Sequence, residues 1–180
     1  MRTKEAKALI ADVPFRADGQ RWMDLGCGDG VFTLALAELL PAGSTIEAWD
    51  INGAALENIP VHHSGVGIQT RTIDFLRTDL PSGMDGILLA NALHFVADQQ
   101  RFLNEVGNAL TPGGLLLVAE YDTEIPVPTW VPHPIGKRRL ATLLSTHGSN
   151  APTLIGKRPS TYGRGDLYTV FAERSASSDP

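Results

Sequence analysis

The stretch WMDLGCGDGVFTLALAELL, residues 22–40, sets an acidic residue, three alternating glycines and an apolar run directly one after another. Glycines at 26, 28 and 30 allow the backbone to turn tightly and let a ligand approach it closely. The apolar run predicts a helix that packs against a sheet, and free N–H groups at its start suit a carboxylate or phosphate. A strand, a glycine turn and a helix in this order predict a small-molecule site.

Apolar strand-like runs alternate with helix-like runs along the chain, which predicts an α/β fold of the Rossmann-like, doubly wound kind. We expect a seven-stranded, mostly parallel sheet whose last strand is antiparallel, because the turn-rich YGRGD joins it to the strand before. The expected strands cover residues 21–24, 45–50, 68–73, 85–91, 115–120, 153–160 and 167–174. The expected helices cover residues 30–40, 52–59, 98–110 and 135–147, with a turn at 111–114 and a proline-rich loop at 125–134.

Length and composition fit one domain. The chain has 180 residues, of which 43% are hydrophobic, and we expect a single domain over 1–174 and a disordered tail at 175–180. Leu9, Ile10, Val13 and Phe15 are spaced to pack a short amphipathic helix near the mouth of the site.

Charge and cysteine content narrow the partners. A net charge of -5 and a pI near 5.5 argue against nucleic acid and anionic membranes. The start of the chain has no apolar core of signal-peptide length and no run could span a bilayer, so we expect a cytoplasmic protein. The single cysteine, Cys27, allows no internal disulfide and no cysteine-rich metal cluster, and no metal site is predicted.

The glycine spacing separates two kinds of nucleotide site. A dinucleotide fingerprint would need its third glycine at Val31, and it normally lacks an acid where Asp24 stands. An acid at the end of the second expected strand suits a ribose in either kind of site, so Asp50 does not decide between them.

The order acid-x-Gly-x-Gly-x-Gly in DLGCGDG resembles the class I S-adenosylmethionine-dependent methyltransferases. The resemblance continues through WDIN, IDF, LLANALHF and LTPGGLLLVAEY, in the order that a doubly wound fold requires, and it covers almost the whole chain. The chain is thus similar to a small, core-only member of that family. This resemblance implies S-adenosylmethionine as cofactor and methyl transfer to a small organic acceptor.

The resemblance also assigns residues to the methionine half of the cofactor. Gly26, Cys27 and Gly28 would contact the methionine end through their backbones. Asp24 would position the ammonium group, and Asn91 would lie beneath the methionine moiety.

Four further residues would hold the adenosine half. Asp50 would accept hydrogen bonds from both ribose hydroxyls, and Ile51 would pack on the adenine. Asp74 would accept from the adenine amino group while the Phe75 backbone N–H donates to the ring.

The sequence indicates catalytic residues less clearly than cofactor-binding residues. Methyl transfer is an in-line displacement, which alignment and exclusion of water accelerate, and a base helps when the acceptor is a hydroxyl or thiol. His94 is the candidate base, or else a hydrogen-bonded residue at a helix entrance. His133 in the proline-rich loop is either a substrate contact or a surface residue, and Tyr121 and Trp130 flank the same region as substrate candidates.

Several alternatives remain. The sequence Asn91-Ala92-Leu93-His94 lacks the Pro-Pro-aromatic motif of members that methylate amino groups of nucleobases or glutamine, and no Pro-Cys nucleophile for cytosine carbon is present. A methyltransferase-like module that binds cofactor or a partner without catalysis stays open, and a dinucleotide-dependent oxidoreductase is disfavoured. We expect the acceptor site to be open, capped by the proline-rich loop, or completed by a partner subunit or a second copy of the chain.

Overall fold

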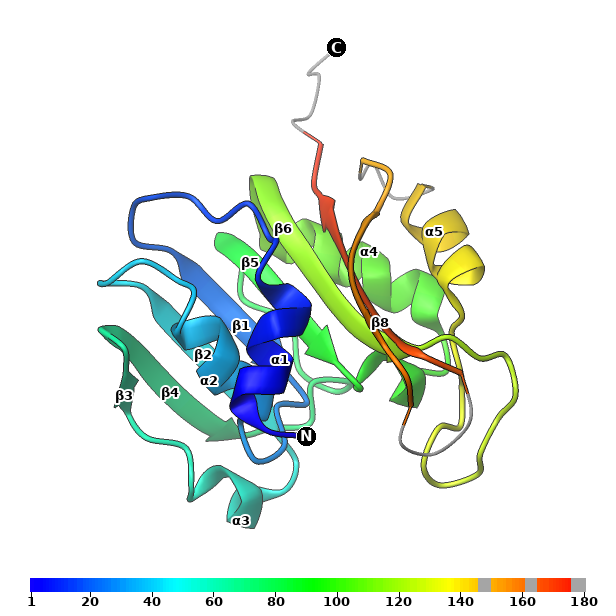
Figure 1. Cartoon of the computed structure of the whole chain (residues 1–180), viewed down its shortest axis with the longest axis horizontal. Helices are drawn as coiled ribbons and strands as arrows, with labels where there is room; N and C mark the ends of the chain where they lie inside the picture. Colours follow the sequence, from blue (N-terminus) through cyan, green and yellow to red (C-terminus); the bar gives the residue numbers. More distant parts are fainter. Residues whose placement is uncertain (146–149, 161–164, 176–180) are drawn as a thin grey trace.

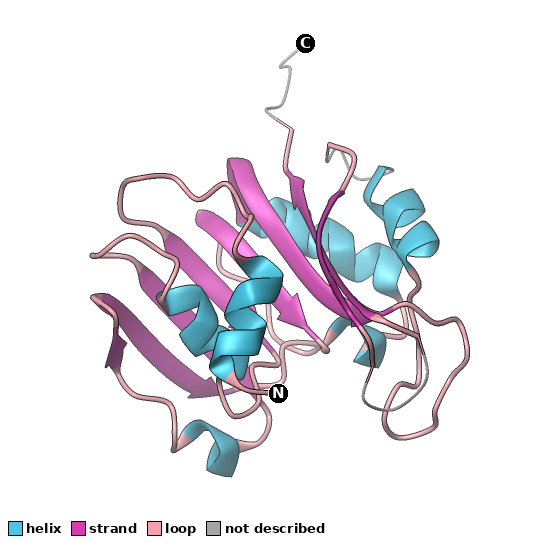
Figure 2. Cartoon of the chain, in the orientation of Figure 1, coloured by secondary structure: helices cyan, strands magenta, loops and turns pink. Residues whose placement is uncertain are grey.

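The computed structural model describes residues 1–145, 150–160 and 165–175. Within them, eight strands form one sheet in the order β3-β4-β2-β1-β5-β6-β8-β7, with helices on both faces (Figure 1 and Figure 2). The strands are β1 (Arg21–Leu25), β2 (Thr45–Asp50), β3 (His62–His63), β4 (Val66–Thr72), β5 (Met84–Ala90), β6 (Leu110–Tyr121), β7 (Thr153–Arg158) and β8 (Leu167–Glu173). The helices are α1 (Thr3–Ile10), α2 (Val31–Ala37), α3 (Gly53–Leu56), α4 (Gln99–Ala109), α5 (Lys137–Ser145) and the 3-10 turn η1 (Leu93–Phe95).

The strand order is that of a doubly wound sheet. The strands β4, β2, β1, β5 and β6 run parallel, and β8 lies antiparallel between β6 and β7. The chain starts in the middle with β1, builds outward to β4 and then crosses back to β5, so the switch point lies between β1 and β5. The predicted α/β fold and its antiparallel last strand are confirmed.

The sheet has one strand more than the seven predicted. The two residues of β3 pair antiparallel with the start of β4 across a two-residue turn at Ser64 and Gly65. Both turn residues have positive φ, 51° and 80°, as a type I′ hairpin turn requires. A two-residue strand is too short to show an alternating pattern, although the Ser-Gly dipeptide is itself a turn signal.

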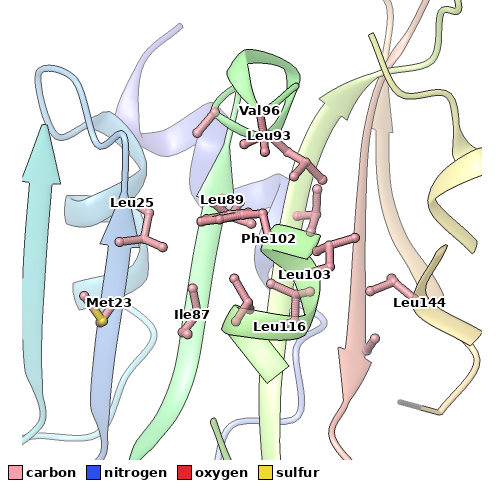
Figure 3. Close-up of a cluster of buried hydrophobic side chains, with 14 of the residues drawn as sticks. Met23, Leu25, Ile87, Leu89, Leu93, Val96, Phe102, Leu103, Leu116 and Leu144 are labelled. Carbon is pink, nitrogen blue, oxygen red and sulfur yellow. The ribbon is translucent and has the colours of Figure 1, made fainter. Parts of the chain in front are cut away.

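Each face of the sheet has its own core, because successive side chains of a strand point to opposite faces. On β5, Ile87 and Leu89 belong to the core under α4 and α5, whereas Leu88 packs with α1 and α2 on the other face. Figure 3 shows the first core, with Phe102 and Leu103 of α4 beside the central strands. The near-continuous apolar strands of the sequence are therefore buried on both sides.

Some element ends differ from the prediction. The helix α2 ends at Ala37 and α5 begins at Lys137, both inside the predicted bounds. Residues 111–114, predicted as a turn, are part of β6. Their pairing with β5 is irregular, with a register shift between Met84 and Gly86.

The N-terminal helix forms as α1, and Val13 and Phe15 lie beyond its end, where the Phe15 ring meets Trp22 edge to face at 5.5 Å. Three predictions fall wholly or partly outside the described residues: the end of the helix predicted over 135–147, the YGRGD turn, and the tail 175–180 after Ser175. None of the described helices is long and apolar enough to cross a membrane.

Candidate active site

A cavity of about 390 Å³ opens at the carboxyl ends of β1, β2 and β5, beside the switch point of the sheet. It is lined by Met1, Asp24, Gly26, Cys27, Gly28, Asp29, Val31, Phe32, Asp50, Ala90, Asn91 and Phe95. Six of the nine residues predicted to contact the cofactor are among them. Ligands in open α/β sheets bind at this edge, so the cavity is the candidate site.

The glycine loop forms the floor of the cavity. The backbone N–H groups of Gly26 and Cys27 both donate to the Trp49 carbonyl of β2, at 2.8 and 3.1 Å. Gly26 has a φ of 73°, and a Cβ there would lie 2.9 Å from the Ala92 side chain. Only glycine fits this position, so the loop follows the sheet edge with its backbone exposed to a ligand.

Asp50 joins the end of β2 to the glycine loop. One carboxylate oxygen accepts from the Gly28 N–H at 2.8 Å and the other accepts from the Asn52 N–H at 2.8 Å. Each carboxylate oxygen has more than one acceptor site, so Asp50 keeps capacity for hydroxyl donors.

Asp24 is fully buried between β1 and α2. The Thr33 hydroxyl of α2 donates to its Oδ2 at 2.6 Å, while its Oδ1 has no hydrogen-bond partner among the described residues. Burial, with a smaller contribution from the charge of Asp50, raises the pKa of Asp24 to about 7, against the lowering effect of the Thr33 bond. A buried carboxylate with an unused oxygen attracts a cationic donor.

Asn91 supplies a second unused acceptor. It follows β5 with a φ of 54°, and its backbone N–H donates to the Ala119 carbonyl of β6 at 2.8 Å. Its Oδ1 is buried without a partner among the described residues. Because buried polar atoms are normally hydrogen-bonded, the oxygens of Asp24 and Asn91 fit a ligand that carries several N–H donors, such as an ammonium group.

Cys27 lies in the loop with a buried side chain. Burial, together with the charge of Asp24, raises the pKa of the Cys27 thiol well above its ordinary value. The thiol therefore stays protonated near neutral pH and is unsuited to nucleophilic attack.

Three residues predicted for the adenosine half do not line the cavity. Ile51 is 72% exposed at the end of β2. Asp74 accepts from the Leu76 N–H at 3.0 Å and pairs with Arg77 at 3.3 Å, while the buried Phe75 ring packs on Phe102 at 5.5 Å. Their contacts with the cofactor remain predictions.

His94 lies in η1 directly after β5, and its side chain is buried. Its Nδ1 lies 2.8 and 3.1 Å from the two carboxylate oxygens of Glu120 at the end of β6, and its backbone N–H donates to Glu120 at 3.1 Å. It does not line the cavity. These contacts fit the second of the two roles that the sequence left open for His94, that of a hydrogen-bonded residue at a helix entrance. The role as a base stays a prediction.

The other substrate candidates lie around the proline-rich loop. The exposed His133 donates its backbone N–H to the His94 carbonyl at 3.0 Å and accepts from the Gln99 amide at 2.8 Å. Trp130 is 75% exposed, and Tyr121 is half-buried at the end of β6. None of the three lines the cavity, so their roles as substrate contacts remain predictions.

Some residues of the site were not among those predicted. Glu120 has no signal in the sequence beyond an acid at the end of an expected strand. The sequence does contain a signal for Asp29 and Phe95, because each directly follows a predicted site residue. The other unpredicted residues that line the cavity are Met1, Val31, Phe32 and Ala90. In the part of the chain that the structure describes, no three His, Cys, Asp or Glu side chains are grouped to hold a metal ion.

Comparison with known families identifies the class of the chain. The sequence model of the methyltransferase domain family matches residues 23–116, more than half of the chain. This chain therefore belongs to the methyltransferase family, whose class I fold it shares and whose cofactor is S-adenosylmethionine.

Individual relatives agree with this class. An uncharacterized methyltransferase of Mycobacterium tuberculosis is 31% identical over 102 residues, which cover 56% of this chain and 50% of that protein. A ubiquinone biosynthesis O-methyltransferase of a Caulobacter species is 29% identical over 106 residues, 57% of this chain and 41% of that protein. The chain thus spans about half the length or less of these curated relatives.

Solved structures show the same fold. The magnesium protoporphyrin IX methyltransferase of Synechocystis with bound S-adenosylmethionine superposes with a TM-score of 0.66 at 14% identity, covering 96% of this chain and 78% of that one. At this identity the likeness concerns the fold alone.

Proposed function

We propose that this chain binds S-adenosylmethionine in the cavity at the switch point and transfers its methyl group to a small organic acceptor. The observation that carries the proposal concerns Asp24 and Asn91, which both line the cavity beside the glycine loop. Each has a buried Oδ1 that has no hydrogen-bond partner among the described residues. When bound, S-adenosylmethionine supplies an electrophilic methyl group on a positively charged sulfur. The residues of the chain bind it, orient it and keep water away.

In this proposal the methionine half lies along the glycine loop. Asp24 and Asn91 accept hydrogen bonds from the ammonium group, and the carboxylate of Asp24 also neutralises its charge. The backbones of Gly26, Cys27 and Gly28 allow close approach.

The adenosine half extends toward β2 and β4. Asp50 accepts from the ribose hydroxyls while it keeps its bonds to the loop, and the exposed Ile51 packs on the adenine. Asp74 and the Phe75 N–H read the edge of the base. This assignment is supported by Asp50 lining the cavity and by the position of Ile51 directly after it.

The chemical step then depends on alignment of the acceptor with the methyl group. No His or Lys side chain is among the residues that line the described cavity, and the proposal routes no step through a general base. The name of one similar protein, which refers to ubiquinone biosynthesis, supports a small organic acceptor.

The test is isothermal titration of the protein with S-adenosylhomocysteine, the reaction product, and with NADH in parallel. We expect micromolar binding of S-adenosylhomocysteine and no binding of NADH. Asp50→Ala should cost about 1.5 to 3 kcal/mol of binding free energy, the scale of hydrogen bonds to a charged group. The exposed Asp79, which does not line the cavity, gives the matched control Asp79→Ala, with unchanged affinity.

Each outcome separates the alternatives. Binding of NADH alone would replace the proposal with an oxidoreductase. Binding of neither compound would favour a module that serves a partner, and wild-type affinity in Asp50→Ala would remove Asp50 from the site.

A further inference from the structure

The cavity is lined both by carboxylates and by exposed apolar side chains. Three carboxylates, those of Asp24, Asp29 and Asp50, line the cavity, and no Lys, Arg or His side chain lines it within the described residues. The exposed residues that line its mouth are Asp29 and two with apolar side chains, Met1 and Phe95, which are 49% and 47% exposed. Exposed large apolar side chains beside a cavity are suited to covering an apolar ligand.

The Phe95 ring is fixed from behind. It packs on the His94 ring in a tilted arrangement, with centroids 4.4 Å apart and planes inclined by 49°. Glu120 in turn holds His94 at both the backbone N–H and Nδ1, and the Glu120 side chain is 1% exposed. The buried His94–Glu120 pair therefore sets the position of an aromatic wall at the mouth, although neither residue reaches the cavity.

Charge restricts what can lie against that wall. With Asp24 paired to the ammonium group, an anionic acceptor would still meet the carboxylates of Asp29 and Asp50, and no Lys, Arg or His side chain lines the described cavity to pair with it. A cationic acceptor would be repelled by the positive sulfur of the bound cofactor at the reacting end. An uncharged acceptor avoids both costs, and a flat one can stack on the exposed face of an aromatic ring.

We propose that the acceptor is an uncharged, flat, apolar molecule, that Phe95 is the residue that holds it at the cavity mouth, and that Glu120 is a positioning residue that acts through His94. This inference rests on the proposed function, because it takes the floor of the cavity to be occupied by the cofactor. It deepens that function by naming the class of acceptor.

The test uses 1-naphthol as an uncharged flat probe and 1-naphthoate as its anionic counterpart, in protein saturated with S-adenosylhomocysteine. Binding of each probe is measured by equilibrium dialysis. We expect 1-naphthol to bind. The affinity for 1-naphthoate should be at least about tenfold lower, the equivalent of one unfavourable charge contact. Phe95→Ala should weaken 1-naphthol binding by about fivefold or more, the scale of one aromatic stacking contact.

Two sets of variants separate position from stability. Glu120→Ala should weaken 1-naphthol binding, and Glu120→Gln, which keeps an acceptor oxygen for the His94 N–H groups, should restore it. Leu154→Ala removes a 51% exposed apolar side chain on β7 and should change nothing. Trp130→Ala tests the other predicted aromatic substrate contact, in the proline-rich loop, and should cost less affinity than Phe95→Ala.

Wild-type affinity for 1-naphthol in Phe95→Ala would overturn the proposal, as would equal binding of the two probes or no binding of 1-naphthol. A loss in Trp130→Ala without a loss in Phe95→Ala would transfer the role to the proline-rich loop and overturn it as well. If Glu120→Ala fails to fold, Phe95→Ala still tests the proposal, because Phe95 is half-exposed and its truncation leaves the core intact. S-adenosylhomocysteine binding is measured first in the same samples, so failure of the cofactor proposal is distinguished from failure of this one.

Discussion

Asp24 is the residue at which folding and ligand binding conflict most directly. The chain places a carboxylate in the core side of β1, gives it one hydroxyl partner and leaves the other oxygen unused. Such a group is costly to ionise without a ligand, since burial disfavours its charged form. In the proposed function the ammonium group of the cofactor offsets that cost, so Asp24 would serve binding at the expense of the ligand-free protein.

The first prediction at this scale concerns pH. Because the pKa of Asp24 lies at about 7 in the ligand-free protein, an ammonium ligand must displace a proton below that pH. We expect the affinity for S-adenosylhomocysteine to fall by up to about tenfold for each pH unit below 7, and to level off above it. Titrations at pH values of about 6, 7 and 8, in buffers of different ionisation enthalpy, should show proton release at the lower values.

Asp24→Asn is the control for this prediction. It keeps the size of the side chain and its bond with Thr33 but has no carboxylate to titrate, so its affinity should be lower and independent of pH in this range. A pH dependence that persists in Asp24→Asn would assign the titration to another group.

Residues near the glycine loop could be predicted from the sequence because their arrangement is local. Asp24 lies near the end of β1, Gly26 and Gly28 follow that strand within a few positions, and a glycine turn there has few other uses. The pairing of His94 with Glu120 could not be predicted in the same way. The two residues are 26 positions apart, and only the register of β5 against β6 brings them together.

At the scale of elements, β5 shows how closely the central strands pack. Gly86 lies beside Trp22 of β1, and a Cβ at Gly86 would overlap the indole ring. We expect Gly86→Ala to lower the free energy of unfolding by about 1 to 3 kcal/mol, the usual cost of overpacking a core. Urea unfolding followed by tryptophan fluorescence measures the change.

The matched variant is Gly107→Ala in α4. A Cβ at Gly107 meets no other atom within 4 Å, so the substitution should stabilise the protein by about 0.5 to 1 kcal/mol through helix propensity. Equal effects of the two substitutions would show that steric overlap at Trp22 does not limit the packing of β5.

The elements whose bounds the sequence predicted best are those with turn signals at both ends. β2 has the predicted bounds, 45–50, because its flanking turns are marked by Gly43 and Asn52. β3 was missed because it has two residues, and the irregular start of β6 was taken for a turn because Pro112 and Gly113 indicate one. In both cases the structure depends on pairing with a neighbouring strand, which cannot be predicted from a local sequence pattern.

At the scale of the whole molecule, the doubly wound order of strands creates the site. It brings the ends of β1, β2 and β5 to one edge, although β5 begins some 60 residues after β1 ends. The same edge holds η1, and the backbone bond from the His133 N–H to the His94 carbonyl connects η1 to the proline-rich loop, whose His133 carbonyl also accepts from Gln99 of α4. The fold therefore follows from the alternating pattern, whereas the shape of the acceptor mouth depends on contacts between distant loops.

The last prediction concerns the stability of the ligand-free protein as a function of pH. In the unfolded chain Asp24 has the ordinary pKa of 3.8, and in the folded chain about 7. Between these values the folded state binds more protons than the unfolded state, so this group makes stability fall as pH rises and contributes a constant deficit above about 7. We expect Asp24→Asn to be more stable than the wild type by an amount that grows by about 1.4 kcal/mol per pH unit from pH 5 to 7 and then stays level.

Urea unfolding of both proteins across this range measures the difference directly. Saturating S-adenosylhomocysteine should reverse the sign of the difference, because only the carboxylate gains the ammonium partner. A difference that does not vary with pH would mean that Asp24 is already ionised in the folded protein and that its buried oxygen has another partner.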